Sequence, residues 1–432
     1  FADEVKAFAP SLNFKNPNGV CWTKDGFLIV AEHNRVLNFP AAEFFYEGPD
    51  VAVGTVVPQG KLIPTEHESY NHGARTCRVG PDNKLYITLG QPFNVQPADK
   101  VDEFNRLGIG GIVRMDLDGS NREVFAIGAR NSVGQDFNPK DGTLWWTDNQ
   151  TDGMGNDIPP GELNRSTKKG EHFGYPYWGG KVKVAGTAAA PDLKDMKEPA
   201  NAIFPQVELP AHQAQLGMTF YSGKQFPAKY RGGIFMASHG SWNRSPASGA
   251  LIQYVPLKAD GTAGKMETFA EGWLNAETGI YSGRPVDVAV MKDGSLLISD
   301  DYVGAIYRVT YAGKEPTAPV DARSTAGAEA RRARRALEAF HVKGADTTKA
   351  VAAALPALSS PDRFIRYAAR VALEAIRRVG TKDRRAIADA ALAIRDFDGA
   401  LGHWGFDENG DTTMRTLTIS VVKNGRFEFE EV

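Results

Sequence analysis

The sequence has little cysteine, little net charge and no long apolar run. Only two of its 432 residues are cysteines, Cys21 and Cys77, so a zinc site built from a set of four cysteines is excluded. The two residues either form one disulfide, which needs an oxidising compartment, or are small buried side chains. The formal net charge of −2 gives no electrostatic basis for binding nucleic acid or an anionic membrane.

Several common motifs are also missing. No apolar run reaches the roughly 18 residues that a bilayer-spanning helix needs. No glycine-rich phosphate loop leads from a strand into a helix, and no Ser-His-Asp order typical of a hydrolase is evident. The chain begins at Phe1 without a visible leader, and we expect a leader to have been removed from a periplasmic or secreted protein.

What is present is a repeat. A short apolar strand, a polar turn of the Asp-Gly type and a second apolar strand recur at residues 20–30, 78–88, 135–146 and 288–298, with a looser copy at 217–221 and 233–237. Asp-Gly favours tight turns between antiparallel strands, and widely spaced hairpins are typical of propeller blades. The sequence therefore predicts a mainly β protein, a β-propeller with five legible blades. A β-sandwich is the alternative.

Composition changes after the last repeat. We expect the propeller over residues 1–312, a linker rich in Pro, Ala and Thr over 313–327, a helical segment over 328–380 and a C-terminal helix plus β-hairpin over 381–432. One face of the helical segment is expected to be apolar, lined by Leu355, Leu358, Phe364, Ala368, Val371 and Ala372. Asn424-Gly425 marks the hairpin. We expect this hairpin to pair with an exposed edge of the propeller.

Polar clusters stand at the junctions between the repeats, where propellers bind ligands over their central channel. His72 is a candidate general base, and Arg130 with Asn131 can bind carboxylates or carbonyls. Residues 147–164 form a loop dense in Asp, Asn and Gln, the oxygen ligands that Ca²⁺ prefers. Residues 238–244 and 283–287 each add an arginine. Together they favour a flat, anionic, metal-assisted ligand above the propeller.

These motifs resemble the soluble quinoprotein sugar dehydrogenases, most closely the L-sorbosone dehydrogenase-like branch. The matching stretches cover roughly residues 18–311 and include 72–82, 128–131, 148–165, 172–176, 238–244 and 283–287. The resemblance implies a six-bladed ring, with pyrroloquinoline quinone (PQQ) and Ca²⁺ as cofactors. Residues 396–432 are similar to the C-terminal end of periplasmic amino-acid-binding proteins of transporters.

The resemblance also implies roles for single residues. His72 would take the proton from the substrate hydroxyl as hydride passes to the quinone. The implied cofactor-binding residues are Arg130, Asn131, His239, Arg244 and Arg284. The implied calcium ligands are the carbonyls of Gln150 and Thr151 at the catalytic ion, and Glu162 with the Phe173 carbonyl at a structural ion. Val133 and Val286 stand where glucose-oxidising members have a glutamine and a second arginine on the quinone.

The function expected from this resemblance is oxidation of a sugar or a sugar-derived aldehyde or alcohol, with electrons passing to a cytochrome or quinone acceptor. Two alternatives stay open. A calcium-dependent lactonase-type propeller would use carboxylates on its metal and no arginine cluster, and a binding propeller would carry no catalysis.

Overall fold

The computed structural model describes residues 7–40, 42, 52–315, 317, 328–340, 346–378, 397–399, 402–404, 418–423 and 426–431. The chain divides into two compact units, residues 1–322 and 323–432. Among the described residues, none of the helices is both long and apolar enough to cross a bilayer. The helix predicted at the start of segment 381–432 lies outside the described residues.

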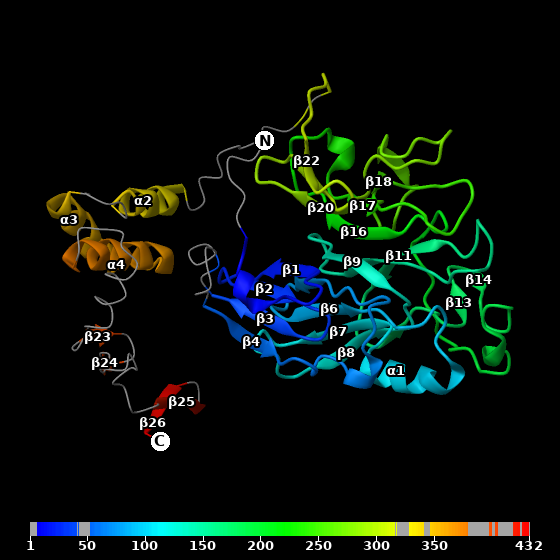
Figure 1. The fold of residues 1–432 in the computed structure, drawn as a ribbon, viewed down its shortest axis with the longest axis horizontal. Helices are drawn as coiled ribbons and strands as arrows, with labels where there is room; N and C mark the ends of the chain where they lie inside the picture. The colour runs from blue at the N-terminus through cyan, green and yellow to red at the C-terminus, as the bar shows by residue number, and fades with distance from the viewer. Residues whose placement is uncertain are drawn as a thin grey trace. The chain divides into compact units, whose positions relative to one another are not determined.

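The first unit is a propeller of five antiparallel sheets, as the repeats predicted (Figure 1). The strands of the first blade are β1 (Gly19–Trp22), β2 (Leu28–Ala31), β3 (Val36–Phe39) and β4 (Gly54–Val57). The strands of the second are β5 (Cys77–Val79), β6 (Leu85–Leu89), β7 (Gly111–Met115) and β8 (Glu123–Ile127), with β12 (Glu171–His172) added parallel to β8.

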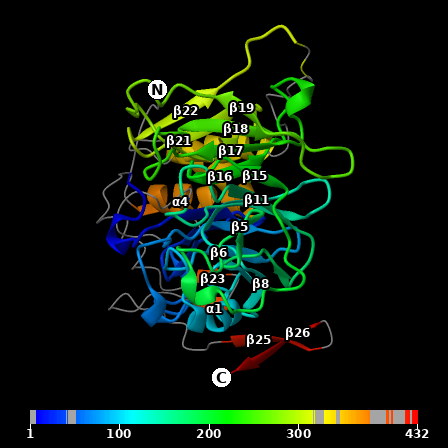
Figure 2. The same ribbon diagram turned by 90° about the vertical axis from the view of Figure 1, so that its right-hand side faces the viewer.

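The remaining blades follow the same plan. The strands of the third are β9 (Ser132–Phe137), β10 (Leu144–Asp148), β11 (Gly161–Ser166) and β15 (Val207–Leu209). The strands of the fourth are β16 (Gln215–Phe220), β17 (Ile234–Ser238), β18 (Leu251–Val255) and β19 (Glu267–Ala270), which lie side by side in Figure 2. The fifth has only β20 (Pro285–Val290), β21 (Leu296–Asp300) and β22 (Ala305–Val309) among the described residues. Helix α1 (Val101–Leu107) and the short pair β13 (Trp178–Gly179) and β14 (Val182–Lys183) lie in loops.

The same local device forms the inner hairpin in three of the blades. Asp82, Asp141 and Asp293 each accept a hydrogen bond from the backbone N–H two residues later, at 3.2, 3.0 and 2.9 Å. The turns then pass through a left-handed residue, such as Gly142 at φ 71° or Gly294 at φ 84°. Glycine adopts this conformation without a steric penalty, so the turns follow from local sequence.

Apolar residues pack between neighbouring blades. One cluster joins the first and second blades, another the second and third, a third the third and fourth, and a fourth the last two. Cys21 on β1 and Cys77 on β5 form a disulfide, with their Cα atoms 5.9 Å apart. This bond ties the innermost strands of the first two blades together.

A central channel of about 230 Å³ is lined by the inner strands of all five blades, so the blades surround one axis. Val133 and Val286 both line this channel. The first and fifth blades carry exposed apolar side chains. These are Val20 and Trp22 of β1 and Ile306 of β22, exposed at 54%, 49% and 71%. A further propeller sheet is not seen among the described residues, which agrees with the five repeats in the sequence.

The second unit contains the predicted helices, α2 (Ala328–Glu338), α3 (Thr347–Ala357) and α4 (Arg363–Arg378). Their core is made by small side chains together with Leu337: Ala354, Ala368, Ala369 and Ala372. Leu355, predicted for the apolar face, is 56% exposed, so that placement was wrong; helix α3 buries Ala350 and Ala354 instead. Strand pairs β23 (Phe397–Gly399) with β24 (Gly402–Trp404) and β25 (Thr418–Lys423) with β26 (Arg426–Glu431) follow. Pairing of the last hairpin with the propeller stays a prediction.

Candidate active site

A polar cavity of about 530 Å³ opens where the loops between the blades meet. Its walls come from the loop before β5, the loop after β6, the junctions at both ends of the β9–β10 hairpin, and the loops before β16 and after β17. The sequence-predicted residues in this wall are His72, Arg130, Asn131 and Gln150. Segments more than a hundred residues apart in the chain thus share one pocket.

His72 lies in this wall as a neutral imidazole with one nitrogen free to act as a base. Its Nδ1 is 2.6 Å from the carbonyl oxygen of Gln91, and because a carbonyl only accepts, Nδ1 carries the proton. Burial, together with the nearby Arg130 guanidinium, lowers the pKa of His72 to about 4. At neutral pH the other nitrogen, Nε2, is therefore unprotonated and holds a lone pair.

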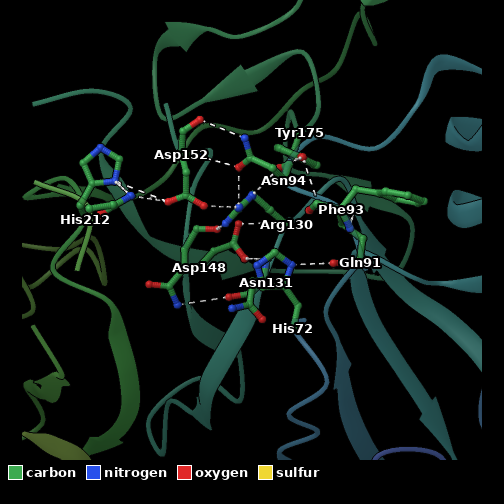
Figure 3. Close-up of polar contacts among 12 residues, drawn as sticks. His72, Gln91, Phe93, Asn94, Arg130, Asn131, Asp148, Asp152, Tyr175 and His212 are labelled. Atoms are coloured by element: carbon green, nitrogen blue, oxygen red, sulfur yellow. Dashed lines mark hydrogen bonds and ion pairs between the residues drawn. The ribbon is translucent and has the colours of Figure 1, made fainter. Parts of the chain in front are cut away.

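Arg130 joins three loops at the cavity (Figure 3). Its Nε donates to the carbonyl of Asn94 at 2.7 Å, Nη1 to the carbonyl of Asn149 at 3.1 Å, and Nη2 to the side chain of Asn94 at 2.8 Å. Nη2 also pairs with Asp152 Oδ2 at 2.9 Å. Asp152 in turn accepts from Asn243 at 2.6 Å. The cavity therefore holds its arginine and its carboxylate as a pair.

A fully buried carboxylate holds Arg130 and Asn131 in place. Asp148, at the end of β10, accepts from the backbone N–H groups of Arg130 and Asn131 at 3.0 and 2.8 Å. It also accepts from Ser132 Oγ at 3.1 Å and from Gln150 Nε2 at 2.8 Å. Four bonds on one carboxylate fix the loop that presents both cofactor-site candidates.

Asp148 faces a second buried acid across the strand pair. Glu162 of β11 is in register with Asp148 of β10 and accepts from Gly180 N at 2.6 Å and Asn164 Nδ2 at 2.8 Å. Burial raises the pKa of both carboxyls, and the charge of Asp148 raises the pKa of Glu162 further. Two buried carboxylates side by side favour either a shared proton or a bound cation.

The oxygen atoms around this pair fit a hard cation. Of the buried side-chain oxygens without a hydrogen-bond partner among the described residues, four belong to residues that bond this pair or follow one that does: Asn131 Oδ1, Gln150 Oε1, Thr151 Oγ1 and Asn164 Oδ1. Buried acceptors left unpaired are costly, and Ca²⁺ is held by such oxygens together with carboxylates and carbonyls. The described residues contain no group of three or more His, Cys, Asp or Glu that could hold a metal, so amide and carbonyl oxygens would complete the set. The ring of Phe173 packs against that of Trp146, with the ring centroids 4.5 Å apart, and the role of the Phe173 carbonyl as a calcium ligand stays a prediction.

Three predicted cofactor residues do not line the cavity. His239 pairs with Asp301 at 2.9 Å, and Arg244 pairs with Asp157 at 3.1 Å. Arg284 donates to the carbonyls of His239 and Gly240 at 3.0 and 2.5 Å. Their assignment to a cofactor stays a prediction.

Sequence reasoning missed much of the wall. His212, from the loop before β16, donates from Nε2 to the Gly155 carbonyl at 2.8 Å. Tyr70, exposed at 88%, and Phe93 also stand in the wall, where they join Trp242 of the predicted 238–244 cluster. A lone histidine and scattered aromatics carry no pattern in sequence, and only the meeting of the loops brings them together.

Part of this chain is similar to known proteins. A family model described as Glucose / Sorbosone dehydrogenase matches residues 61–243. An uncharacterized protein of Borreliella burgdorferi is 39% identical over 255 residues, which are 58% of this chain and 63% of that protein. The chain thus spans less than two thirds of that relative.

Solved structures share the fold. The iodide and calcium structures of the Trichoderma reesei carbohydrate-active enzyme of family AA12 superimpose with TM-scores of 0.55 and 0.54, at 20% identity over 67% of this chain and 79% of theirs. A glucose dehydrogenase gives a TM-score of 0.50 at 18% identity over 73% of this chain and 87% of its own. Residues 61–243, which carry His72, Arg130 and the loop after β10, therefore match the glucose / sorbosone dehydrogenase family, as the sequence motifs predicted.

Proposed function

We propose that the protein is a PQQ- and calcium-dependent dehydrogenase that oxidises a sugar or a sugar-derived aldehyde or alcohol. The observation that carries the proposal is His72, an unprotonated imidazole in the wall of a polar cavity within the stretch that matches the sugar dehydrogenase family. A general base needs a free lone pair within reach of a substrate hydroxyl, and Nε2 of His72 offers one.

The chain's own part is to bind, orient and deprotonate. His72 Nε2 accepts the proton of the substrate hydroxyl, while the Gln91 carbonyl holds Nδ1–H and keeps the ring in one tautomer. When bound, the quinone supplies the hydride acceptor and Ca²⁺ a Lewis acid beside its carbonyl. The asparagines of the wall supply donors and acceptors for hydroxyl groups.

The residues that would hold calcium are Gln150 and Thr151 at the catalytic ion, and Glu162 with Phe173 at a structural ion. The unpaired buried side-chain oxygens of Gln150 and Thr151 support the first of these sites. Arg130 and Asn131 would hold the quinone, Arg130 by exchanging Asp152 for a cofactor carboxylate. His239, Arg244 and Arg284 would reach the cofactor only by leaving their present partners.

The compartment belongs to the same proposal. A disulfide between Cys21 and Cys77 is stable in an oxidising environment, which supports a periplasmic or secreted location. The electron acceptor would be a cytochrome or a quinone of that compartment.

The test is reconstitution. The full chain is incubated with PQQ and Ca²⁺, and dye reduction is followed with a panel of aldoses and L-sorbosone. His72→Ala should lose about 10²–10⁴-fold in kcat, the usual contribution of general base catalysis. His67→Ala is the matched control, since His67 pairs with Glu103 and is not part of the cavity wall.

Two results would contradict the proposal. One is the absence of dye reduction together with no quinone absorbance after dialysis. The other is full activity of His72→Ala, which would remove the assigned base. Hydrolysis of lactones by the metal-loaded chain without PQQ would favour the lactonase alternative instead.

A further inference from the structure

His72 has an unusual backbone. Its φ is +54°, in the left-handed region that residues with a Cβ rarely adopt. Such a conformation costs of order 1 kcal/mol or more and persists only where the surroundings enforce it. Something in the structure must therefore hold His72 in this conformation.

Two glycines make the conformation possible without enforcing it. A Cβ on Gly90 would lie 2.6 Å from the carbonyl oxygen of His72 and 2.7 Å from its Cβ. A Cβ on Gly73 would lie 2.5 Å from Nδ1 of His33, in the turn between β2 and β3 of the first blade. His72 is thus packed tightly between the first blade and the end of β6.

Arg75 holds the backbone of His72 in this conformation through hydrogen bonds. Its side chain is only 2% exposed, and its guanidinium reaches across the boundary between the two blades. Nη1 donates to the carbonyl of His72 at 2.8 Å and more weakly to that of Ala74 at 3.3 Å, while Nε donates to the carbonyl of His33 at 3.1 Å. One rigid, planar group therefore bonds the backbone of His72 to the backbone of the first blade.

We propose that Arg75 is a positioning residue for His72: by holding the His72 carbonyl against the turn of the first blade, it keeps the left-handed backbone that aims the imidazole into the cavity. The role of His72 as a general base rests on the proposed function, whereas the positioning of its ring by Arg75 does not. The orientation of the ring thereby depends on the packing of the first two blades.

The charge of Arg75 acts in the same place. The charged groups that bear on His72 are Arg130 and Asp152 at the cavity and Arg75 behind it, and both arginines oppose a second proton on the ring. Burial lowers the pKa of Arg75 itself to about 10, so it remains a cation at neutral pH. A variant without this charge should protonate His72 more readily.

The test follows the protonation and tautomer of the His72 ring by NMR. The intact chain is labelled with ¹⁵N-histidine, the His72 signals are identified by their loss in His72→Gln, and they are followed by NMR as the pH falls. In the parent chain we expect a single Nδ1–H tautomer that stays neutral to about pH 5. In Arg75→Gln the midpoint should rise, by less than one pH unit because burial and Arg130 lower it more than Arg75 does, and the tautomers should mix because the hydrogen bond is lost.

Arg75→Lys separates the two effects. It keeps the charge, so the midpoint should move little, but an ammonium cannot bridge both carbonyls and the tautomers should again mix. Arg75→Lys is also the milder substitution, so it tests the positioning of His72 if Arg75→Gln does not fold. The matched control is Arg114→Gln, since Arg114 lies on β7 of the second blade and bonds Asp82 and Tyr86 of the same blade, not His72.

Unchanged His72 signals in a folded Arg75→Lys chain would overturn the proposal, and so would equal changes in Arg114→Gln. In the reconstituted enzyme, Arg75→Lys should lower kcat by about 10–100-fold with KM nearly constant, as misplacement of a catalytic group does. If no sugar is oxidised by the parent chain, the proposed function fails while the NMR result still stands.

Discussion

Arg130 Nη2 and Asp152 Oδ2 lie 2.9 Å apart in the wall of the cavity. Arg130, which is expected to bind a carboxylate of the cofactor, is therefore paired with a carboxylate of its own chain. Asp152 is held there by Asn243 and by Asn94, whose Nδ2 donates to its carbonyl at 3.0 Å. An anionic ligand that binds Arg130 must therefore displace or outcompete Asp152.

The first prediction concerns this pair. Asp152→Asn keeps the size of the side chain but removes its charge, so the ion pair with Arg130 is lost and no carboxylate of the chain competes with one of the cofactor. Affinity for PQQ, measured by absorbance titration, should rise about tenfold, equivalent to ~1.4 kcal/mol. Asp141→Asn, which breaks the pair with Arg165 away from the cavity, should leave affinity unchanged. Weaker binding in Asp152→Asn would mean that Asp152 itself shapes the ligand site.

The second prediction concerns pH. Because the pKa of His72 is lowered from 6.5 to about 4, the folded state favours the neutral ring. The activity kcat/KM should stay constant from about pH 8 to about pH 5 and fall as the base is protonated near pH 4. A fall centred near the ordinary histidine pKa would show that the ring is not desolvated.

The same shift affects stability. The unfolded chain binds the proton at 6.5 and the folded chain only near 4, so the contribution of His72 is complete above 6.5 and is lost as the pH falls toward 4. Burial lowers the pKa of His172 to about 4 as well, with the same sign. The free energy of unfolding of His72→Gln, measured by urea denaturation, should therefore fall less steeply between pH 6.5 and about pH 4 than that of the parent chain.

The third prediction concerns the disulfide. Cys21 and Cys77 are separated by 56 residues, and closing a loop of this length stabilises a fold by about 4 kcal/mol through the unfolded state. The double variant Cys21→Ser, Cys77→Ser should lose most of that in urea denaturation, and its stability should not respond to a reductant. The parent chain should respond, and equal stability of both chains would contradict the prediction.

The fourth prediction concerns the cation. Ca²⁺ at about one hundred times its dissociation constant should stabilise the fold by ~2.7 kcal/mol, seen as a higher Tm, and a chelator should reverse it. Glu162→Gln should remove the gain. Glu171→Gln is the control, because Glu171 is also buried but bonds Ser166 and Thr167 at the other end of β11 from Glu162. A gain that persists in Glu162→Gln would place the ion elsewhere.

Much of the propeller could be predicted because its causes are local. The turns at Asp82, Asp141 and Asp293 are closed by a side chain and a backbone N–H two residues away, so a short stretch of sequence contains the whole device. Leu355 shows the limit of the same reasoning. The helical period predicts which residues share a face, but it does not predict which residues of that face the neighbouring helices cover.

The sequence by itself determined the repeated hairpins, the change from strand to helix after the fifth blade, and the presence of His72, Arg130 and an oxygen-rich loop at blade junctions. Only the tertiary structure decided which of these meet. The bond between Arg130 and Asp152, the contact of Arg75 with His33, the disulfide and the place of His212 all join segments from different blades or loops. Local propensity acts over a few residues, whereas such contacts arise when packing of the blades brings distant loops to one end of the channel.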